Sequence, residues 1–268
     1  MKQVFLCNDS ITGIFSAVYD AWQERNRKEV CEIAIKDRYE SELFCEYKEV
    51  TQTERKAAAV EHMIVKNLGM EVYRHIYYAL LSDDPGRGTA ILGTILAARG
   101  MHHPEKVMEQ LGNPFVEQVF ELGRRVGNEA HLLTGFVRFK ELEGGILFSE
   151  ISPKNQVLPC LADHFQNRFP LENWIIQDRK RDVCAVHEKG KRWILAQGFS
   201  LEGRLQAETT EQKTHGMTQD ERIIQDLWRA FWETISIKER HNPKCQRNHL
   251  PLRYRPYMTE FNKKTENL

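Results

Sequence analysis

Apolar positions in the first half of the chain recur every three or four residues, which is the spacing of an amphipathic helix. Phe15, Val18, Tyr19 and Trp22 form one such face. Further helices are predicted around residues 57–68 and over residues 71–81, 89–99 and 114–133. Short apolar runs at residues 2–6 and 32–35 predict two strands. The first half is therefore expected to be mostly helical, with a small strand pair.

The pattern changes near Gly135, where runs typical of strands replace the helical spacing. Strands are predicted over residues 136–142, 146–151, 174–178, 183–188 and 192–197, with one helix over residues 159–169. Glu143, Gly144 and Gly145 form a hairpin signal between the first two strands. The order β-β-α-β-β-β predicts a mainly antiparallel sheet with the helix on one face. The predicted fold class is α+β, with regions 1–134 and 135–268.

After a polar linker at residues 201–216, Thr218 and Glu221 have the spacing of a capping box. Thr51 and Glu54 repeat that spacing before the helix at residues 57–68. In the helix that Thr218 opens, five apolar residues are expected to lie in the core: Ile224, Leu227, Trp228, Phe231 and Ile235. Beyond it, prolines at positions 243, 251 and 256 are expected to prevent regular structure.

Charge carries information only through its distribution, because 38 Lys and Arg balance 38 Asp and Glu. Residues 238–255 hold six Lys or Arg against one Glu, which predicts a local basic surface. The six cysteines are scattered without a Cys-x-x-Cys pair, as in proteins of a reducing cytoplasm. No signal peptide or long apolar span is present, so a cytoplasmic location is expected and no membrane partner.

Two stretches combine basic side chains with aromatic rings, a pairing that suits phosphate contact and base stacking. The candidate nucleic-acid-binding residues of the first stretch are His164, Arg168, Trp174 and Arg181. Those of the tail are Lys244, Arg247, Arg253, Tyr254 and Arg255. Arg168, Arg181 and the tail cations are expected to contact phosphate, and Trp174 or Tyr254 to meet a base.

Structural interpretations of the same residues stay open. Trp174 can pack the helix onto the sheet, while Arg168 interacts with the last carbonyls of that helix. Asp178 can equally begin an ordinary turn. The tail can pack over the helix that carries Trp228 and Trp232.

Other motifs favour structure over chemistry. His241, Cys245 and His249 offer three metal ligands, but Pro243 interrupts their spacing and no fourth ligand accompanies them, so no metal is expected. The segment Gly86–Thr89 resembles part of a phosphate-binding loop, but no strand precedes it and a helix start is favoured. Cys7 is expected to be a buried, inert thiol.

The motifs HFxxRF at residues 164–169 and WxIxD at residues 174–178, the Trp-rich helix and the RYRPY tail together resemble an uncharacterised bacterial family of DNA repair or DNA metabolism proteins. The N-terminal residues 4–19 are similar as well, so the resemblance covers nearly the whole chain. The resemblance implies a radical SAM partner that modifies or repairs DNA, and a related domain fused to uracil-DNA glycosylases. Because this chain has no closely spaced cysteine triplet, we expect the iron–sulfur cluster to belong to that partner. No cofactor is expected here.

The expected function is therefore that of a DNA-binding accessory protein of a DNA repair or modification system. One alternative is a nucleobase-directed enzyme, similar to a glycosylase or lyase, that uses His164, Asp178 or Glu150. The other is a protein–protein interaction module that makes no DNA contact of its own. The sequence leaves open whether the protein catalyses a reaction.

Overall fold

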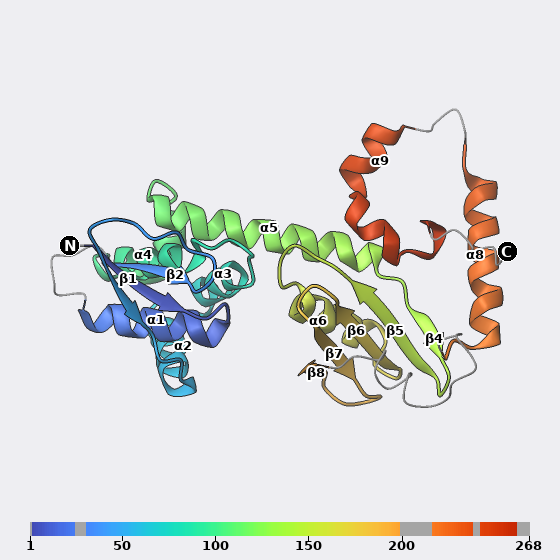
Figure 1. The fold of residues 1–268 in the computed structure, drawn as a ribbon, viewed down its shortest axis with the longest axis horizontal. Coiled ribbons are helices and arrows are strands. Elements are labelled where there is room, and N and C mark those ends of the chain that lie inside the picture. The colour runs from blue at the N-terminus through green and yellow to red at the C-terminus, as the bar shows by residue number, and fades with distance from the viewer. Residues whose placement is uncertain (1, 25–30, 199–215, 238–241, 262–268) are drawn as a thin grey trace. The chain divides into compact units, whose positions relative to one another are not determined.

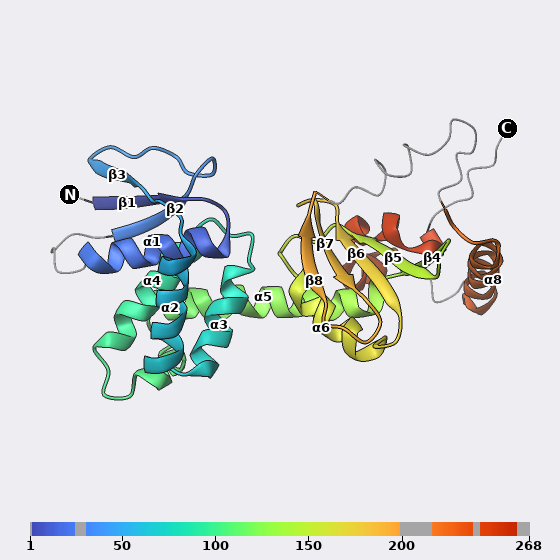
Figure 2. The same ribbon diagram turned by 90° about the horizontal axis from the view of Figure 1, so that it is seen from below.

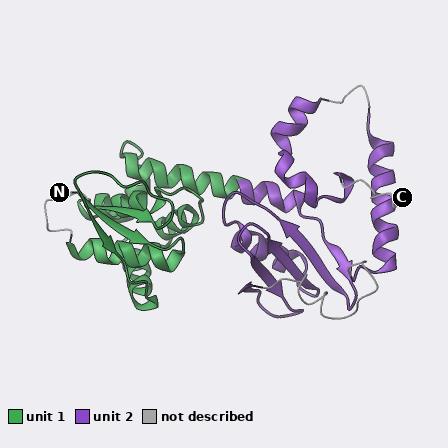
Figure 3. Ribbon diagram, viewed as in Figure 1, with its two compact units in different colours: residues 1–128 green, residues 129–268 purple. Residues whose placement is uncertain are grey.

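The computed structural model describes residues 2–24, 31–198, 216–237 and 242–261. The chain divides into two compact units, residues 1–128 and residues 129–268 (Figure 3). Helices and strands occur in both, which confirms the α+β fold class. Among the described residues, no helix is both long and apolar enough to cross a membrane.

Unit 1 contains a three-stranded parallel sheet in the order β2-β1-β3, with helices α1 and α4 packed against β1 and β2 (Figure 1). Its strands are β1 (Lys2–Cys7), β2 (Cys31–Ile35) and β3 (Cys45–Glu49). Its helices are α1 (Ile11–Glu24), α2 (Glu54–Asn67), α3 (Met70–Leu80), α4 (Arg87–Arg99) and the 3₁₀ helix η1 (Pro104–Glu109). Helix α5 (Pro114–Phe136) contains the boundary between the units.

The third strand, β3, was not expected from the sequence. Its residues are mostly polar and none is fully buried, so no apolar run indicates it. Backbone pairing with β1, from Lys2 opposite Cys45 to Leu6 opposite Glu49, creates this strand at the edge of the sheet.

Helix starts follow the sequence with one correction. Thr53, not Thr51, caps α2, and its hydroxyl accepts a hydrogen bond from the backbone N–H of Lys56. Gly69 adopts φ 91° between α2 and α3, a backbone conformation that favours glycine, which confirms that α2 ends there.

The glycine-rich segment Gly86–Thr89 forms the start of helix α4, as the sequence favoured, and its glycines allow close helix packing. A Cβ on Gly88 would lie 2.6 Å from Ile33 Cγ2, so the absence of a side chain lets α4 approach β2. The Thr89 hydroxyl accepts from the N–H of Ile33 and donates to its carbonyl, at 2.9 and 3.0 Å. These contacts attach α4 to the free edge of β2.

Unit 2 contains a five-stranded sheet in the order β4-β5-β6-β7-β8. Its strands are β4 (Lys140–Leu142), β5 (Ile146–Ile151), β6 (Asn173–Asp178), β7 (Val183–His187) and β8 (Ile194–Gln197). Helix α6 (Leu158–Arg168) lies between β5 and β6 in the chain, as predicted, and packs on one face of the sheet (Figure 2).

The prediction of a mainly antiparallel sheet is confirmed, since three of the four strand pairs are antiparallel and one is parallel. Strands β5 and β6 are parallel, with Ile146 opposite Asn173 and Ile151 opposite Asp178. The reason is the connection, because a chain that crosses through α6 returns to the starting edge before it enters β6. The sheet is therefore mixed.

The expectation that the apolar residues of α8 (Gln219–Ile235) lie in the core is wrong. Thr218 caps the helix as predicted, through the N–H of Glu221. Contacts with η4 (Thr259–Phe261) include the Trp232 ring, which lies 5.6 Å from Phe261. A second face stays exposed in the described structure. We call it the α8 stripe, and it consists of Ile223, Ile224, Leu227, Trp228, Phe231 and Ile235, with Leu227 64 % exposed.

The prolines of the tail do not prevent regular structure, which corrects another expectation. Pro243 opens the short helix α9 (Pro243–His249), because a proline in the first helical turn loses no hydrogen bond. Pro256 lies inside the 3₁₀ helix η3 (Leu252–Tyr257). The predicted linker at residues 201–216 lies, apart from Gly216, outside the described residues, as does His241.

Candidate nucleic-acid interface

Two loops of unit 2 lie side by side because the parallel strands β5 and β6 end at the same edge of the sheet. Ile151 and Asp178 are register partners at the ends of these strands. The N–H of Arg179 donates to the carbonyl of Ile151 at 3.0 Å, so the β6–β7 turn begins against the end of β5. Cations from both loops are thereby gathered at one edge.

A buried ion pair shapes the β6–β7 turn. Asp178 is 1 % exposed and accepts hydrogen bonds from Arg181 Nη1 at 2.8 Å and from the N–H of Lys180 at 3.0 Å. Burial raises the pKa of Asp178, although the Arg181 guanidinium opposes that shift. Arg181 also donates to the carbonyls of Pro153 and Lys154 in the β5–α6 loop. Asp178 and Arg181 therefore connect the two loops.

A second buried carboxylate, Glu129, accepts five hydrogen bonds. Its donors are Lys154 N–H, Asn155 N–H, Asn155 Nδ2, Arg253 Nη2 and Tyr254 Oη, at 2.6–2.9 Å. Burial by itself would raise the pKa of Glu129, but the hydrogen bonds from Tyr254, Lys154 and Asn155 outweigh it and the pKa is lowered. Glu129 is therefore held as a carboxylate that joins α5, the β5–α6 loop and the tail.

The two basic stretches of the sequence meet at the β5–α6 loop. Arg181 donates to the Lys154 carbonyl, the Lys154 N–H donates to Glu129, and Arg253 donates to the same Glu129 oxygen. We call the cations around this loop the basic edge: Lys154, Arg179, Lys180, Arg181 and Arg253. Most of them are exposed, with the Arg253 side chain 49 % exposed. The edge presents several guanidinium and ammonium groups from segments far apart in the sequence.

Neither aromatic residue expected to meet a base is available for stacking. Trp174 is 0 % exposed, and its ring stacks on His187 with 4.9 Å between centroids. Tyr254 is 2 % exposed, its ring lies under the Arg253 guanidinium, and its hydroxyl is held by Glu129. Each ring packs inside unit 2 in this structure, which agrees with the structural interpretation of these residues and offers no exposed face for a base.

The remaining predicted cations lie away from the basic edge. His164 and Arg168 are exposed one turn apart on α6, as expected, but Arg168 is at the end of the helix that leads to the start of β6. Its guanidinium lies over Phe169, 5.7 Å from the ring centre. The sequence therefore identified exposed cations here but not a single shared surface.

The tail cations also divide into two kinds. Lys244 and Arg247 are exposed on α9. Arg255 is half-buried, lies 5.0 Å over the Phe261 ring and has a buried Nε. Arg255 thus packs against Phe261, and its expected phosphate contact stays a prediction.

The three titratable groups suggested for catalysis do not converge. Glu150 and Asp178 point to opposite faces of the sheet, since Asp178 is the register partner of Ile151, the neighbour of Glu150. Glu150 pairs with Arg179 at 2.9 Å, while His164 is exposed on α6. Within the described residues, these side chains form no common acid–base site.

The metal and thiol candidates can be placed only in part. His241 lies outside the described residues, while Cys245 and His249 are both exposed on α9. The described residues hold no cluster of three His, Cys, Asp or Glu suited to a metal. Cys7 is buried, as expected, and burial raises its pKa to about 11, which disfavours the reactive thiolate.

Sequence reasoning missed Glu129, Lys154 and Asn155, which organise the basic edge. Each lies in an unremarkable local pattern, Glu129 inside a helix and the other two in a strand-to-helix loop. The one available signal was the presence of an acid within an otherwise apolar helical face, next to Ala130 and Leu133.

Comparison with known proteins gives one family match. A family model described as a domain of unknown function, DUF4130, matches residues 85–260, which include all of unit 2 up to η4 and the end of unit 1. The comparison with curated proteins gives no match. Because the family model covers more than half of the chain, this protein belongs to the DUF4130 family.

Proposed function

We propose that this protein is a DNA-binding accessory protein of a DNA repair or modification system, and that it works with a radical SAM partner. In this proposal the basic edge contacts the phosphate backbone, and the exposed cations Lys244 and Arg247 of α9 extend the contact. The observation that supports it best is the meeting of Arg181 and Arg253 at the Lys154 loop. The partner comes from the family resemblance of the sequence alone.

The chemistry of the basic edge favours backbone contact over base recognition. Four of its five cations come from loops and Arg253 comes from η3. Trp174 and Tyr254 are buried, and the buried carboxylates Asp178 and Glu129 are paired with Arg181 and Arg253. Guanidinium and ammonium groups in this setting bind phosphates without regard to sequence. We therefore expect binding to depend steeply on salt and little on base composition.

The test is fluorescence anisotropy of the purified protein with labelled single- and double-stranded DNA, titrated over salt. Lys154→Gln with Lys180→Gln removes two exposed charges from the basic edge. We expect weaker binding to all sequences, and a salt slope reduced by about 0.9 for each lost duplex phosphate contact. The matched control is Arg55→Gln with Lys66→Gln, which removes two exposed charges from α2 of unit 1. Equal salt slopes for the two variants would exclude the basic edge as the DNA-binding surface.

A second variant pair separates the tail from the edge. Lys244→Gln with Arg247→Gln removes the exposed cations of α9 without touching the Glu129 network. If α9 extends the contact, the Lys244→Gln with Arg247→Gln variant should also have a flatter salt slope than the unaltered protein, as the Lys154→Gln with Lys180→Gln variant does. An unchanged slope would confine the contact to the basic edge.

One observation favours the alternative of a protein–protein interaction module. The α8 stripe exposes six large apolar side chains on a single helix, and exposed apolar patches of this kind mark association surfaces. No DNA binding at low salt, together with stable co-purification with the radical SAM partner, would favour this alternative over the DNA-binding function.

A further inference from the structure

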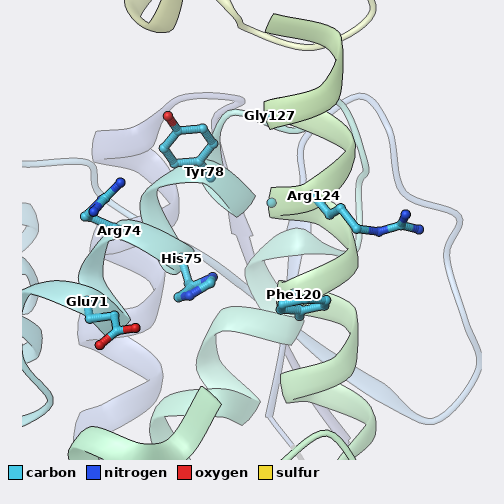
Figure 4. Close-up of a pocket in the computed structure, with 8 residues that line it drawn as sticks. Glu71, Arg74, His75, Tyr78, Phe120, Arg124 and Gly127 are labelled. Carbon is cyan, nitrogen blue, oxygen red and sulfur yellow. The ribbon is translucent and has the colours of Figure 1, made fainter. Parts of the chain in front are cut away.

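Unit 1 contains a pocket of about 360 Å³ between α3 and α5 (Figure 4). This volume is within the range of small-molecule sites, which is roughly 300–1,000 Å³. All of its lining residues belong to unit 1. The pocket is therefore separate from the basic edge, which lies in unit 2.

Two glycines one turn apart on α5, Gly123 and Gly127, leave the space open. A Cβ on Gly123 would lie 3.5 Å from the His75 carbonyl and from Tyr78 Cβ, and one on Gly127 would lie 3.9 Å from Tyr78 Cε1. These are ordinary contact distances, so alanine would fit at both positions. Glycine inside a helix costs about 0.5–1 kcal/mol relative to alanine. Close packing of α3 and α5 therefore does not require glycine at these two positions. The two glycines instead provide the open space of the pocket.

Aromatic rings form the walls of this space. His75 and Phe120 have ring centres 6.1 Å apart with planes inclined by 32°, and Tyr78 lines the pocket beside Gly127. Figure 4 shows the His75 ring projecting from α3 towards α5. All three rings are only half-buried. Flat rings facing a side-chain-free helix surface suit a flat aromatic ligand, which stacks on the rings and lies against the backbone.

Arginines stand at the rim. Arg74 and Arg124 are both exposed, and in Figure 4 Arg74 lies on the α3 side while the Arg124 side chain points from α5 away from α3. Arg124 pairs with Glu121 at 2.8 Å, whereas Arg74 makes no ion pair with any described residue. A guanidinium on a long side chain can turn over the rim and hold a phosphate with two hydrogen bonds. Arg74 is consequently the better placed of the two for an anionic ligand.

We propose that this pocket binds a nucleobase together with its phosphate, as in a mononucleotide or the terminal nucleotide of a single strand. The base stacks on His75 and Tyr78 against the glycine face of α5, and the phosphate pairs with Arg74. The proposal goes beyond the DNA-binding function and does not depend on it, because it uses residues of unit 1 alone.

Isothermal titration calorimetry of the full chain with AMP tests the proposal, with adenosine and ribose 5-phosphate as the two halves of the probe. AMP is expected to bind at least tenfold more tightly than either half. Arg74→Gln should weaken AMP binding by roughly tenfold, the effect of losing one charged hydrogen-bond partner, and leave adenosine unchanged. Absence of AMP binding by the unaltered protein would overturn the proposal.

Filling the pocket is the second arm. Gly127→Leu occupies the space and should abolish AMP binding, while Gly127→Ala narrows it and should weaken binding several-fold. The matched control is Gly135→Leu on the same helix, where an added Cβ meets nothing within 4 Å and the pocket is not involved. AMP binding that survives Gly127→Leu in a folded protein would overturn the assignment.

A competition experiment distinguishes the two possible ligands, a free mononucleotide and the terminal nucleotide of a single strand. A 5′-phosphorylated single strand that displaces AMP from the pocket identifies a strand end as the ligand, and one that does not identifies a free nucleotide. The variant Lys154→Gln with Lys180→Gln should leave AMP binding unchanged. This result separates failure of the pocket from failure of the basic edge.

Discussion

The core of unit 1 and the basic edge of unit 2 are held in place by different physical means. In unit 1, apolar side chains from the sheet and from α1 to α5 form one large buried cluster, which includes Ile14, Ile64, Ile76 and Ile91 at 0 % exposure. In unit 2, two buried carboxylates, Glu129 and Asp178, hold the loops and the tail through hydrogen bonds. Unit 1 is thus held together mainly by close packing of apolar side chains. The edge of unit 2 is held in place by directed hydrogen bonds and ion pairs.

This difference determines how each unit should lose stability when one of its residues is substituted. An apolar core tolerates small changes of shape but loses stability in proportion to the volume that is removed or forced in. A buried polar network is stable only while every member has a partner, because an unpaired buried group keeps its full desolvation cost. We therefore change the polar network in unit 2 and the apolar packing in unit 1.

The largest effect is expected from Glu129→Ala, which removes the acceptor of five hydrogen bonds. The Tyr254 hydroxyl and two backbone N–H groups lose their acceptor, and each buried polar group left unpaired costs about 1–3 kcal/mol. Amide hydrogen exchange followed by mass spectrometry should show faster exchange in peptides of residues 140–187. Peptides of residues 57–98 in unit 1 should keep their protection. Equal loss in both units would contradict the separation drawn here.

An intermediate effect is expected from Gly88→Ala in unit 1. The new Cβ would stand 2.6 Å from Ile33 Cγ2, and overpacking of a core contact costs about 1–3 kcal/mol. Gly100→Ala, at the other end of α4, is the control, since its Cβ would have only the Ala97 carbonyl nearby, at 3.8 Å. Chemical denaturation should destabilise the first variant alone. If both behave alike, α4 does not need the close approach to β2.

The smallest effect concerns pH. The fold lowers the pKa of Glu129 below its usual 4.5, so the stability that this group adds is complete above pH 4.5 and is lost as the pH falls through the lowered pKa. Asp178 has a raised pKa, so the fold favours its protonated form and its contribution falls as the pH rises through the raised value. The two groups therefore contribute to the pH dependence of unit 2 with opposite signs.

The difference in stability between the unaltered protein and Glu129→Gln isolates the first of these groups. Measured by denaturation between about pH 3 and pH 6, this difference should shrink towards the acid end. A difference that is constant over the range would mean that Glu129 does not carry the charge assigned to it.

Local patterns predicted most elements of the fold. The five strands of the second half and the helix between β5 and β6 appear where alternation and apolar runs placed them, within a few residues. The exceptions have physical causes. The polar strand β3 exists because of its partner β1, and the direction of β6 relative to β5 follows from the α6 crossover.

The candidate site was less accessible to the sequence. Composition identified the basic stretches, and the structure places Arg181 and Arg253 around one loop. Composition could not reveal that Trp174 and Tyr254 would be buried, because an aromatic ring suits a core as well as a stacking surface. Nor could periodicity show that the apolar face of α8 would be uncovered, since it reports which residues share a face and not what packs against them.

The α8 stripe has a consequence for the life of the protein in a cell. Exposed apolar side chains on a helix are what chaperones and proteases recognise in incompletely folded chains, and abundance responds to such recognition several-fold. A copy with this stripe uncovered carries that signal even when both of its units are folded. We therefore expect the half-life of the chain in a cell to rise with the fraction of copies in which the stripe is covered.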